Sequence, residues 1–506
     1  MNNRIKELIE QIVPVCESWV QKGEDGLDRF VDPNDNEEIS AHYGATHAAA
    51  AFIIWGKQTG NDALYNKGVT LLDSILKRWD KSKTLPAFHF DFNNLALCLM
   101  EGLVDDEMAA RIRETVINTS DSNHNTINWL PMRWAVNKKR IEWTKDDKYS
   151  SVIAHCKETI AKATNADGGV EDRLPHGMSF NLQYDLATVA VLQFLRVHGE
   201  EIELSKELGF LLNAVAPDGD INYQGRGTNQ IFAWGLWIYL LASSGHSEVL
   251  QTALAYLTSR LPKMLDNNNL MLNEWDGKEK YLWWDYHYAS VYIAHCMLWL
   301  ILAYLDFGKK AITPISPTST ETGLHIHRSE KAFVSWFEGR KEYLAENGPA
   351  VAAIWTKKDG LIFKGTFGPW QGPFGNKYIY EDAVIKNFLG LLEVKRNTDW
   401  SKDRYVHKLL PSLDSETELM LKPLFSNIAV SETNGILEIS FENQFNNEVL
   451  FNAPVANQNQ KIYLITDKSQ IPTVCNSTIR NQYNWVWLHQ SHTFRGRGIK
   501  LKFDLC

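Results

Sequence analysis

Cysteine is scarce in this sequence. Six cysteines are spread over 506 residues, and no two of them form a C-x-x-C pair. A disulfide framework and a zinc knuckle both need clustered cysteines, so neither is expected. His325 and His327 share one face of an expected strand, but no Asp, Cys or third His stands near them. We therefore expect no metal and no cofactor.

Long apolar runs are also missing. The longest run, Val291–Leu305, is interrupted by His295 and is shorter than the ~18 residues that a membrane helix needs. Residues 1–10 indicate an amphipathic helix and lack the basic and apolar regions of a signal peptide. These features predict no membrane partner and a cytoplasmic location.

Runs of Lys and Arg are absent, and the formal net charge is -9. A protein whose main partner is a nucleic acid would need a basic surface, so that function class is excluded. An acidic polymer can still bind through a local cluster of Arg and His side chains.

Aromatic side chains, in contrast, are abundant. The chain contains 18 tryptophans, and 11% of its residues are Phe, Trp or Tyr, which is high for a soluble protein. Carbohydrate sites use such rings as stacking surfaces, although a large core also needs them. The length of 506 residues predicts two domains rather than one core.

The first 308 residues have helical periodicity. Some segments are amphipathic, and others, such as 231–242, are apolar on nearly all sides, which predicts an outer and an inner layer of helices. Apolar residues recur at steps of three and four near residues 3–21, 40–58, 61–79, 90–103, 106–117, 126–139, 147–164, 179–198, 203–214, 229–243, 246–262 and 286–306.

Polar loop signals recur at a nearly constant interval in the helical part. They begin at Asp121, Asp167, Asp218 and Asp266, which are 46, 51 and 48 residues apart. A period of about 50 residues matches one helical hairpin per repeat. The pattern predicts an (α/α) toroid of about six helical hairpins over residues 1–308, with these loops at one end.

The composition changes after residue 308. Residues 309–322 are rich in Pro, Ser and Thr and indicate a linker. The rest of the chain predicts an antiparallel β-sandwich domain over residues 323–506, so the expected fold class is multidomain α+β. Alternating strand patterns occur at 323–328, 331–337, 350–355, 360–365, 435–441, 449–451, 461–466 and 498–503.

The most unusual stretch is 216–230, with the sequence APDGDINYQGRGTNQ. It cannot form a core, yet it leads directly into the apolar segment 231–242, as a functional loop on a rigid helix does. The alternative interpretation is a helix entry that is capped by Thr228 or Asn229.

Five further polar clusters precede expected inner helices, and all of them can face one cleft together with residues 216–230. A single His or Asn at a helix start is more often a cap or a satisfied core group. Asn181, Tyr184 and Asp185 lie one turn apart and are expected to share one helix face. The clusters are His42-Tyr43-x-x-x-His47, His89-x-Asp91-x-Asn93-Asn94, Asn128-Trp129-x-x-x-Arg133, His176 to Asp185, and Trp284 to Tyr288.

The order of helical array, linker and β-sandwich resembles the toroid-type polysaccharide lyases, which include the heparinase and hyaluronate lyase families. The segment 169–184, together with Asp218-Gly-Asp-x-x-Tyr-x-Gly-Arg-Gly, also resembles a Gly-Arg-Ser motif of lyase-like toroid proteins. Gln230 departs from the pattern, because some relatives carry a second Arg after the motif.

The resemblance implies β-elimination at a uronate in an acidic polysaccharide or oligosaccharide. The C5 proton can leave once hydrogen-bond donors neutralise the neighbouring carboxylate, and Asn181, His176 and Arg226 are the expected donors. Tyr223, with Tyr288 in reserve, is expected to move the proton, helped by a phenolate that Arg226 stabilises. The expected substrate-binding residues are Tyr184, Asp185, Asn222, Asn229, Gln230, Asn93, Asn94, Arg133, Trp129, Tyr286 and His287.

Three other functions remain open at this point. A C5-epimerase would use similar proton chemistry, and a glycan-binding scaffold would bind without turnover. A glycoside hydrolase would use a pair of carboxylates. The carboxylates available for such a pair are Asp167, Glu171, Asp172, Asp218, Asp220 and Asp285.

Overall fold

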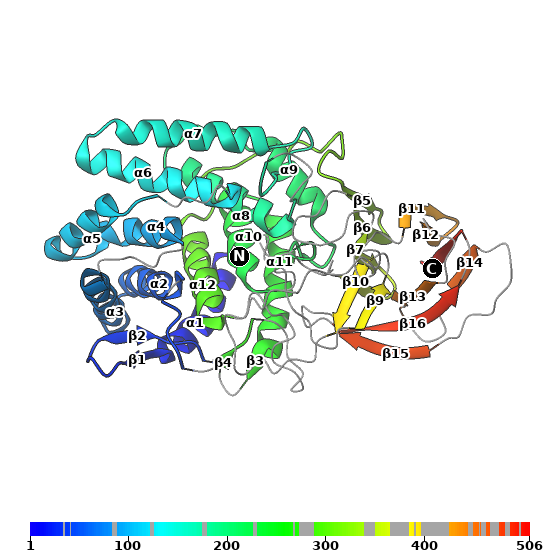
Figure 1. Cartoon of the computed structure of the whole chain (residues 1–506), viewed down its shortest axis with the longest axis horizontal. Coiled ribbons are helices and arrows are strands. Elements are labelled where there is room, and N and C mark those ends of the chain that lie inside the picture. Colours follow the sequence, from blue (N-terminus) through cyan, green and yellow to red (C-terminus); the bar gives the residue numbers. More distant parts are fainter. Residues whose placement is uncertain are drawn as a thin grey trace.

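The protein consists of helices on one side and antiparallel strands on the other, as the computed structural model shows (Figure 1). The mainly helical first part and the later strands are therefore confirmed. The structure describes residues 1–33, 36–40, 42–82, 89–121, 126–174, 180–225, 230–266, 269–272, 288–338, 350–364, 384–388, 391–395, 425–443, 449–454, 456, 462–465, 475–480, 486–494 and 497–506.

The helices lie where the periodicity predicts them. The even-numbered helices are α2 (Gly44–Thr59), α4 (Phe90–Met100), α6 (Leu130–Thr144), α8 (Leu182–Val197), α10 (Phe232–Ser244) and α12 (Ala289–Leu305). The odd-numbered helices are α1 (Asn2–Ser18), α3 (Asp62–Ser82), α5 (Asp106–Asn118), α7 (Lys148–Ala163), α9 (Ser205–Ala214) and α11 (Ser247–Arg260). Short 3-10 turns are η1 (Glu101–Leu103), η2 (Ile127–Trp129) and η3 (Leu261–Met264).

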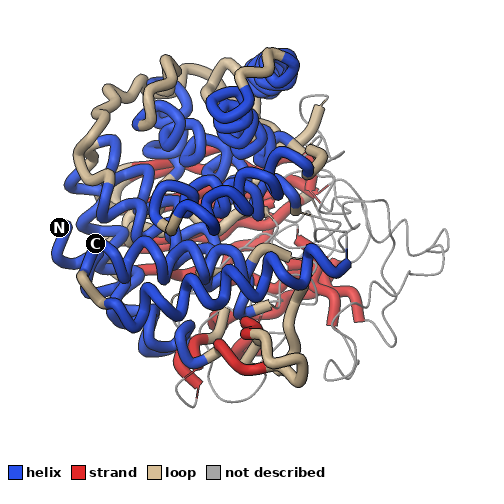
Figure 2. Tube along the Cα trace, turned by 90° about the vertical axis from the view of Figure 1, so that its left-hand side faces the viewer, coloured by secondary structure: helices blue, strands red, loops and turns tan. Residues whose placement is uncertain are grey.

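The even-numbered helices contact one another in a ring. Each contacts the next, and α12 contacts α2, which closes the ring. The odd-numbered helices pack against them from outside: α3 on α2, α5 on α4, α7 on α6, α9 on α8, α11 on α10, and α1 on α12. In Figure 2, where the left-hand side of Figure 1 faces the viewer, the helices lie in front of the strands.

This arrangement explains why the two sets of helices differ in composition. Every residue of α10 is buried, because the helix is covered by two ring neighbours, by α11 and by the filled interior. Aromatic rings fill that interior: the ring centroid of Trp299 lies 5.0 Å from that of Tyr239 and 6.0 Å from that of Phe194. The ring is therefore packed with side chains and is not a pore.

The connections between helices differ in length at the two ends of the ring. The chain passes from an inner to an outer helix through short turns, such as 60–61 and 245–246. It passes from an outer to an inner helix through long segments, such as 164–181 and 215–231. All the polar clusters precede inner helices, so they lie at the end with long segments, which we call the loop end.

The segment between α12 and the first C-terminal strand is bound along the helices. A Cβ atom at Gly209 on α9 would lie only 1.8 Å from the carbonyl oxygen of Ile315, so only glycine allows this approach. The segment that was expected to be a linker runs along the helices, from the end of the ring opposite the loop end to the loop end itself. Its amides at Gly308, Lys310, Ile312 and Ile315 donate to the carbonyls of Ala242, Ser243, Ser244 and Ser205, and Thr322 donates to Asp167.

The described strands pair in an antiparallel manner. One sheet has the order β5 (Leu324–Arg328), β6 (Ala332–Phe337), β7 (Ala350–Thr356), β8 (Gly360–Lys364). A second has the order β11 (Phe425–Thr433), β12 (Ile436–Asn443), β17 (Gly498–Asp504), β14 (Ile462–Ile465). A third has the order β13 (Val449–Pro454), β16 (Val486–Phe494), β15 (Cys475–Arg480).

Three two-stranded pairs complete the described strands. These are β1 (Val20–Lys22) with β2 (Asp28–Phe30), β3 (Leu265–Asp266) with β4 (Asn269–Leu270), and β9 (Val384–Phe388) with β10 (Leu391–Lys395). The β-sandwich itself stays a prediction. Within the described part of the chain, no helix has both the length and the hydropathy that crossing a bilayer requires.

Asp32, which is remote from α12 in the sequence, caps the start of this helix. Its Oδ2 accepts hydrogen bonds from the Ser290 amide at 2.9 Å and the Ser290 hydroxyl at 3.0 Å, and both residues are buried. Because the first amides of a helix have no partner within the helix, Asp32→Ala should lower the free energy of unfolding by about 1–2 kcal/mol. Urea titration measures this change. Ser290→Ala removes one of the two bonds and should cost less; a neutral Asp32→Ala would contradict the capping role.

Candidate functional site

Histidine and aromatic side chains from four inner-helix starts meet at the loop end. The ring centroid of His42 lies 4.3 Å from that of His89 and 5.0 Å from that of Tyr288, and His89 lies 5.2 Å from Trp129. These residues precede α2, α4, α12 and α6. His42 is half-buried, and the other three are buried. We call His42, His89, Trp129 and Tyr288 the loop-end cluster.

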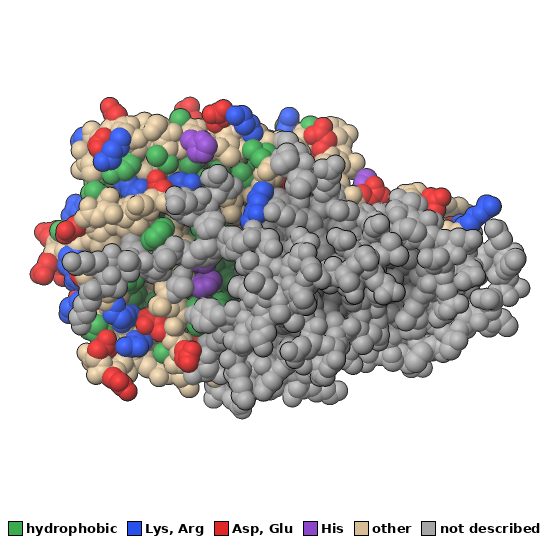
Figure 3. Space-filling view, viewed as in Figure 1, with side chains coloured by type: hydrophobic (Ala, Val, Ile, Leu, Met, Phe, Trp, Pro, Cys, Tyr) green, Lys and Arg blue, Asp and Glu red, His purple; other side chains and the backbone are tan. Residues whose placement is uncertain are grey.

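Charges of both signs are mixed on the face of the helical part that Figure 3 shows. Lys and Arg side chains are interspersed with Asp and Glu on the helical side, and histidines are visible among hydrophobic side chains there (Figure 3).

His89 is held in a conformation that is rare for a residue with a side chain. Its φ and ψ are 60° and 34°, in the left-handed region, which costs about 1–3 kcal/mol. The Asn93 Nδ2 donates to the His89 carbonyl at 3.0 Å, and the Thr46 hydroxyl donates to Asn93 Oδ1 at 2.7 Å. The amide of Asn93, a predicted substrate-binding residue, thus fixes His89 in place.

A second layer of rings forms the floor beneath the loop-end cluster. Tyr43 stacks on Phe92 at 4.3 Å, and Phe232 stacks on His295 at 4.5 Å. His47 lies 5.2 Å from His295. Burial lowers the pKa of His47 to about 4 and that of His295 well below its usual range. The floor is therefore apolar and carries neutral imidazoles at neutral pH.

The neutral imidazoles predict acid sensitivity. The ordinary pKa of 6.5 is lowered to about 4 at His47, so between these values the unfolded chain binds more protons and stability falls as the pH falls. At pH 5 the loss from His47 should be about 2 kcal/mol relative to pH 7. We expect His47→Gln to show a smaller loss than the parent protein in urea titrations at the two pH values.

The exposed His155 provides the matched control on α7. His155→Gln should leave the difference in stability between pH 7 and pH 5 unchanged. An equal difference in His47→Gln and the parent protein would show that His47 does not contribute to the acid sensitivity.

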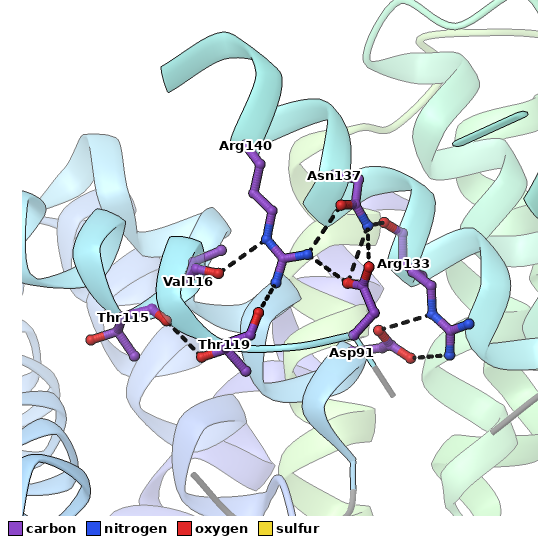
Figure 4. Close-up of polar contacts among 8 residues, drawn as sticks. Asp91, Thr115, Val116, Thr119, Arg133, Asn137 and Arg140 are labelled. Atoms are coloured by element: carbon purple, nitrogen blue, oxygen red, sulfur yellow. Dashed lines mark hydrogen bonds and ion pairs between the residues drawn. The ribbon is translucent and has the colours of Figure 1, made fainter. Parts of the chain in front are cut away.

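Arg133, a predicted substrate-binding residue, is paired with a buried carboxylate. Its Nη2 lies 3.0 Å from Asp91 Oδ2 and its Nε lies 3.4 Å from Oδ1 (Figure 4). Burial raises the pKa of Asp91 to about 6, although Arg133 opposes the shift. Two turns further along α6, Arg140 donates to the carbonyls of Val116 and Thr119 and thereby holds the end of α5 (Figure 4).

Two predicted residues at the start of α8 make hydrogen bonds within the protein. Asn181 is the N-cap and accepts from the Gln183 amide at 3.0 Å. Tyr184 is buried, and the Asp185 carboxylate accepts from the Val170 amide at 3.1 Å. The amides of Tyr184 and Asp185 both donate to the Asn181 carbonyl, at 3.0 and 2.9 Å, so the three residues lie one turn apart; their shared role stays a prediction. Burial raises the pKa of Asp185, and nearby carboxylates on the side of α7 and α9 add to the shift.

Tyr223 does not have the environment that proton transfer requires. Its side chain is fully buried, its hydroxyl donates to the Ala214 carbonyl, and its ring lies 6.1 Å from that of Phe333 in β6. Burial raises the pKa of Tyr223, which disfavours the expected phenolate, while its expected partner Arg226 lies outside the described residues. Sequence reasoning missed this because the partner, Phe333, is remote in the chain.

The remaining predicted residues divide into two groups. Asn222 Nδ2 donates to the Gln230 carbonyl at 2.9 Å and closes the loop 222–230; both residues are buried, as is Asn94 on α4. The others lie outside the described residues, so their roles stay predictions. These are Arg226, His176, Asn229, Tyr286 and His287, together with Thr228, Trp284 and Asp285.

Most of the carboxylates proposed for a hydrolase have structural partners in the described part of the chain. Asp167 accepts from Thr322, and Asp220 pairs with Lys364. Glu171 accepts from Asn165 Nδ2 at 3.4 Å, and Asp218 accepts from the Asp220 amide at 3.1 Å. Within the described ranges, no group of three or more His, Cys, Asp and Glu side chains is placed to hold a metal ion.

Comparison with known proteins gives weak structural likenesses. No family model matches the chain, and no curated protein matches its sequence. An α-1,6-mannanase from Salegentibacter sp. HEL1_6 has 13% identity and a TM-score of 0.40, with 60% of this chain and 99% of that chain covered. An unsaturated glucuronyl hydrolase from Streptococcus agalactiae has 13% identity and a TM-score of 0.43, with 60% and 92% covered.

A polysaccharide lyase has 13% identity and a TM-score of 0.39, with 59% of this chain and 96% of that chain covered. Each likeness is confined to about three fifths of this chain. All the identities and TM-scores are low, and we draw no conclusion about function from them.

Proposed function

We propose that this protein is a lyase that cleaves a uronate-containing glycan by β-elimination, with its active site at the loop-end cluster. The observation that carries the proposal is the convergence of His42, His89 and Tyr288 from three separate inner-helix starts, within 4.3 and 5.0 Å of His42. Functional sites are typically built from side chains that converge in this way at the loop end of a rigid scaffold.

Each member of the cluster has a role in this proposal. The two imidazoles, His42 and His89, donate hydrogen bonds to the uronate carboxylate, so that charge can develop when the C5 proton leaves. Tyr288 removes the C5 proton and returns a proton to the leaving oxygen while the bond from C4 to that oxygen breaks and a C4–C5 double bond forms. Trp129 provides a ring on which a sugar can stack.

The proposal includes the architecture around the site. Residues 1–308 would form a complete (α/α) toroid of six helical hairpins that carries the active site, and residues 323–506 would form a β-sandwich. The ring of contacts among the even-numbered helices supports the first part. The antiparallel pairing of the described C-terminal strands supports the second.

A glycoside hydrolase is the second candidate because of Asp91. Burial raises the pKa of this carboxyl to about 6, which suits a general acid at neutral pH. Asp91 follows His89 by two residues, in the first turn of α4. Its pairing with Arg133 at 3.0 Å favours a structural role and makes this the weaker candidate.

A screen of the purified protein against uronate polymers tests the proposal. We expect the ultraviolet absorbance of the unsaturated product to rise in step with new reducing ends. Reducing ends without absorbance would establish a hydrolase instead. Incorporation of solvent deuterium at C5 without cleavage would establish an epimerase, and binding without any turnover would establish a glycan-binding scaffold.

A further inference from the structure

A buried charged cluster joins the helical part to strand β8. Lys364, the last residue of β8, pairs with Asp220 and also donates to the Tyr256 hydroxyl. That hydroxyl lies 3.0 Å from Asp220 Oδ2. The side chains of Lys364 and Asp220 are each only 1% exposed. Asp220 belongs to the loop between α9 and α10, so a strand residue meets a loop-end segment here.

Asp220 organises its own loop at the same time. Its Oδ1 accepts from the Asn222 amide at 2.8 Å, and its carbonyl accepts from the Ala216 amide at 2.7 Å. The Trp237 indole donates to the Gly219 carbonyl at 3.3 Å. The carboxylate therefore links the fold of residues 216–222 to the ammonium group of Lys364.

A second strand holds the beginning of the same loop. Arg328 of β5 donates to the Asn213 carbonyl at 3.0 Å and to the Val215 carbonyl. Its guanidinium carbon lies 4.8 Å from the ring centroid of Phe333, which also contacts Tyr223. Strand side chains thus hold the loop at residues 213–215, at Asp220 and at Tyr223.

The loop in turn contacts the start of α8. The Leu182 amide donates to Gln224 Oε1 at 2.8 Å. Gly225 has a φ of +93°, and a Cβ atom there would lie 2.6 Å from the Asn181 side-chain carbon. A shift of the loop would therefore shift the first turn of α8, which carries Tyr184 and Asp185.

We propose that Lys364 is a positioning residue. Through this side chain, strand β8 sets the conformation of residues 213–225 at the loop end. An effect of Lys364 on catalysis rests on the proposed function, whereas its effect on the conformation of the loop does not. Loss of the ammonium group would leave the buried Asp220 carboxylate without the cation that it contacts, and the charge of the buried Arg260 would offset only part of this loss. The loop would then open toward water to solvate that carboxylate.

Hydrogen–deuterium exchange of the full-length protein tests the proposal without a substrate. In Lys364→Met, peptides that cover 213–225 should exchange about 10- to 100-fold faster than in the parent protein, while peptides from α2 and α4 remain unchanged. Equal exchange of the loop in the two proteins would overturn the proposal. Faster exchange over the whole chain would also overturn it, because Lys364 would then support global stability only.

Two further variants make the test specific. Lys358→Met removes an exposed lysine of the neighbouring β7–β8 turn, which pairs with Asp504 at 2.8 Å, and should leave the loop unchanged. Asp220→Asn combined with Lys364→Met removes both charges, so exchange of the loop should return toward the parental rate. If the double variant exchanges as fast as Lys364→Met, the unpaired carboxylate is not the cause and the proposal fails.

An activity measurement then separates this inference from the proposed function. If the lyase activity is found, Lys364→Met should lower the value of kcat/KM at least about tenfold, and the double variant should recover part of it. Altered exchange in the absence of any lyase activity would support the positioning role and reject the proposed function alone.

Discussion

Replacing Tyr288 with phenylalanine should lower the rate of glycan cleavage by about 10²- to 10⁴-fold, the contribution of a positioned acid–base group. The substitution keeps the ring that lies 5.0 Å from His42 and removes only the hydroxyl. Sugar stacking and folding do not need that hydroxyl in the proposed mechanism. We therefore expect kcat to fall while KM and the melting temperature change little, as steady-state kinetics and thermal unfolding would show.

Tyr304 provides a matched control on the same helix. It lies near the other end of α12, where its ring meets that of Trp55 at 5.3 Å, remote from the loop-end cluster. Tyr304→Phe should retain the parental rate. If Tyr288→Phe is as active as Tyr304→Phe, then Tyr288 does not transfer the proton and the assignment of the active site to this cluster is wrong.

Arg133→Met should lower the free energy of unfolding by about 3–5 kcal/mol, because it leaves the Asp91 carboxylate buried without its cation. The side chains of Arg133 and Asp91 are 6% and 1% exposed, so water cannot readily replace the guanidinium group. Urea titration near neutral pH measures the change. Combining Arg133→Met with Asp91→Asn removes both charges and should recover part of the loss.

An ion pair on the surface provides the control for the loss of stability expected in Arg133→Met. Arg113 lies 3.2 Å from Glu101, and its side chain is 40% exposed. Arg113→Met should cost less than about 1 kcal/mol, because water screens and solvates such a pair. If the Arg133 and Arg113 variants lose equal stability, the pair with Asp91 contributes no more than a surface contact does.

The location of the helices could be predicted from sequence because the cause is local. A helix that buries one stripe needs apolar residues at steps of three and four, and one that is covered on all sides needs them everywhere. The segments 61–79 and 231–242 show these two patterns, and they correspond to the outer helix α3 and the inner helix α10. The polar clusters before inner helices could be recognised for the same reason, since chain direction alone places every inner-helix start at one end.

The direction of individual side chains could not be predicted in this way. The stretch 216–230 has the composition of an exposed functional loop, yet Tyr223 is buried against β6 and Asp220 pairs with Lys364. The Pro-rich segment after residue 308 resembles a free linker, yet its amides bind along α9 and α10. In each case the partner lies on another element, and the local pattern carries no information about it.

The sequence by itself determined the helical and strand regions, the repeat of loops and the set of polar residues at the inner-helix starts. Only the tertiary structure decided which of those residues meet: His42, His89 and Tyr288 come together, whereas Tyr223 and Asp185 point elsewhere. The physical reason is that periodicity reflects backbone geometry over a few residues. The neighbours, burial and pKa of a side chain instead depend on how distant elements pack around it.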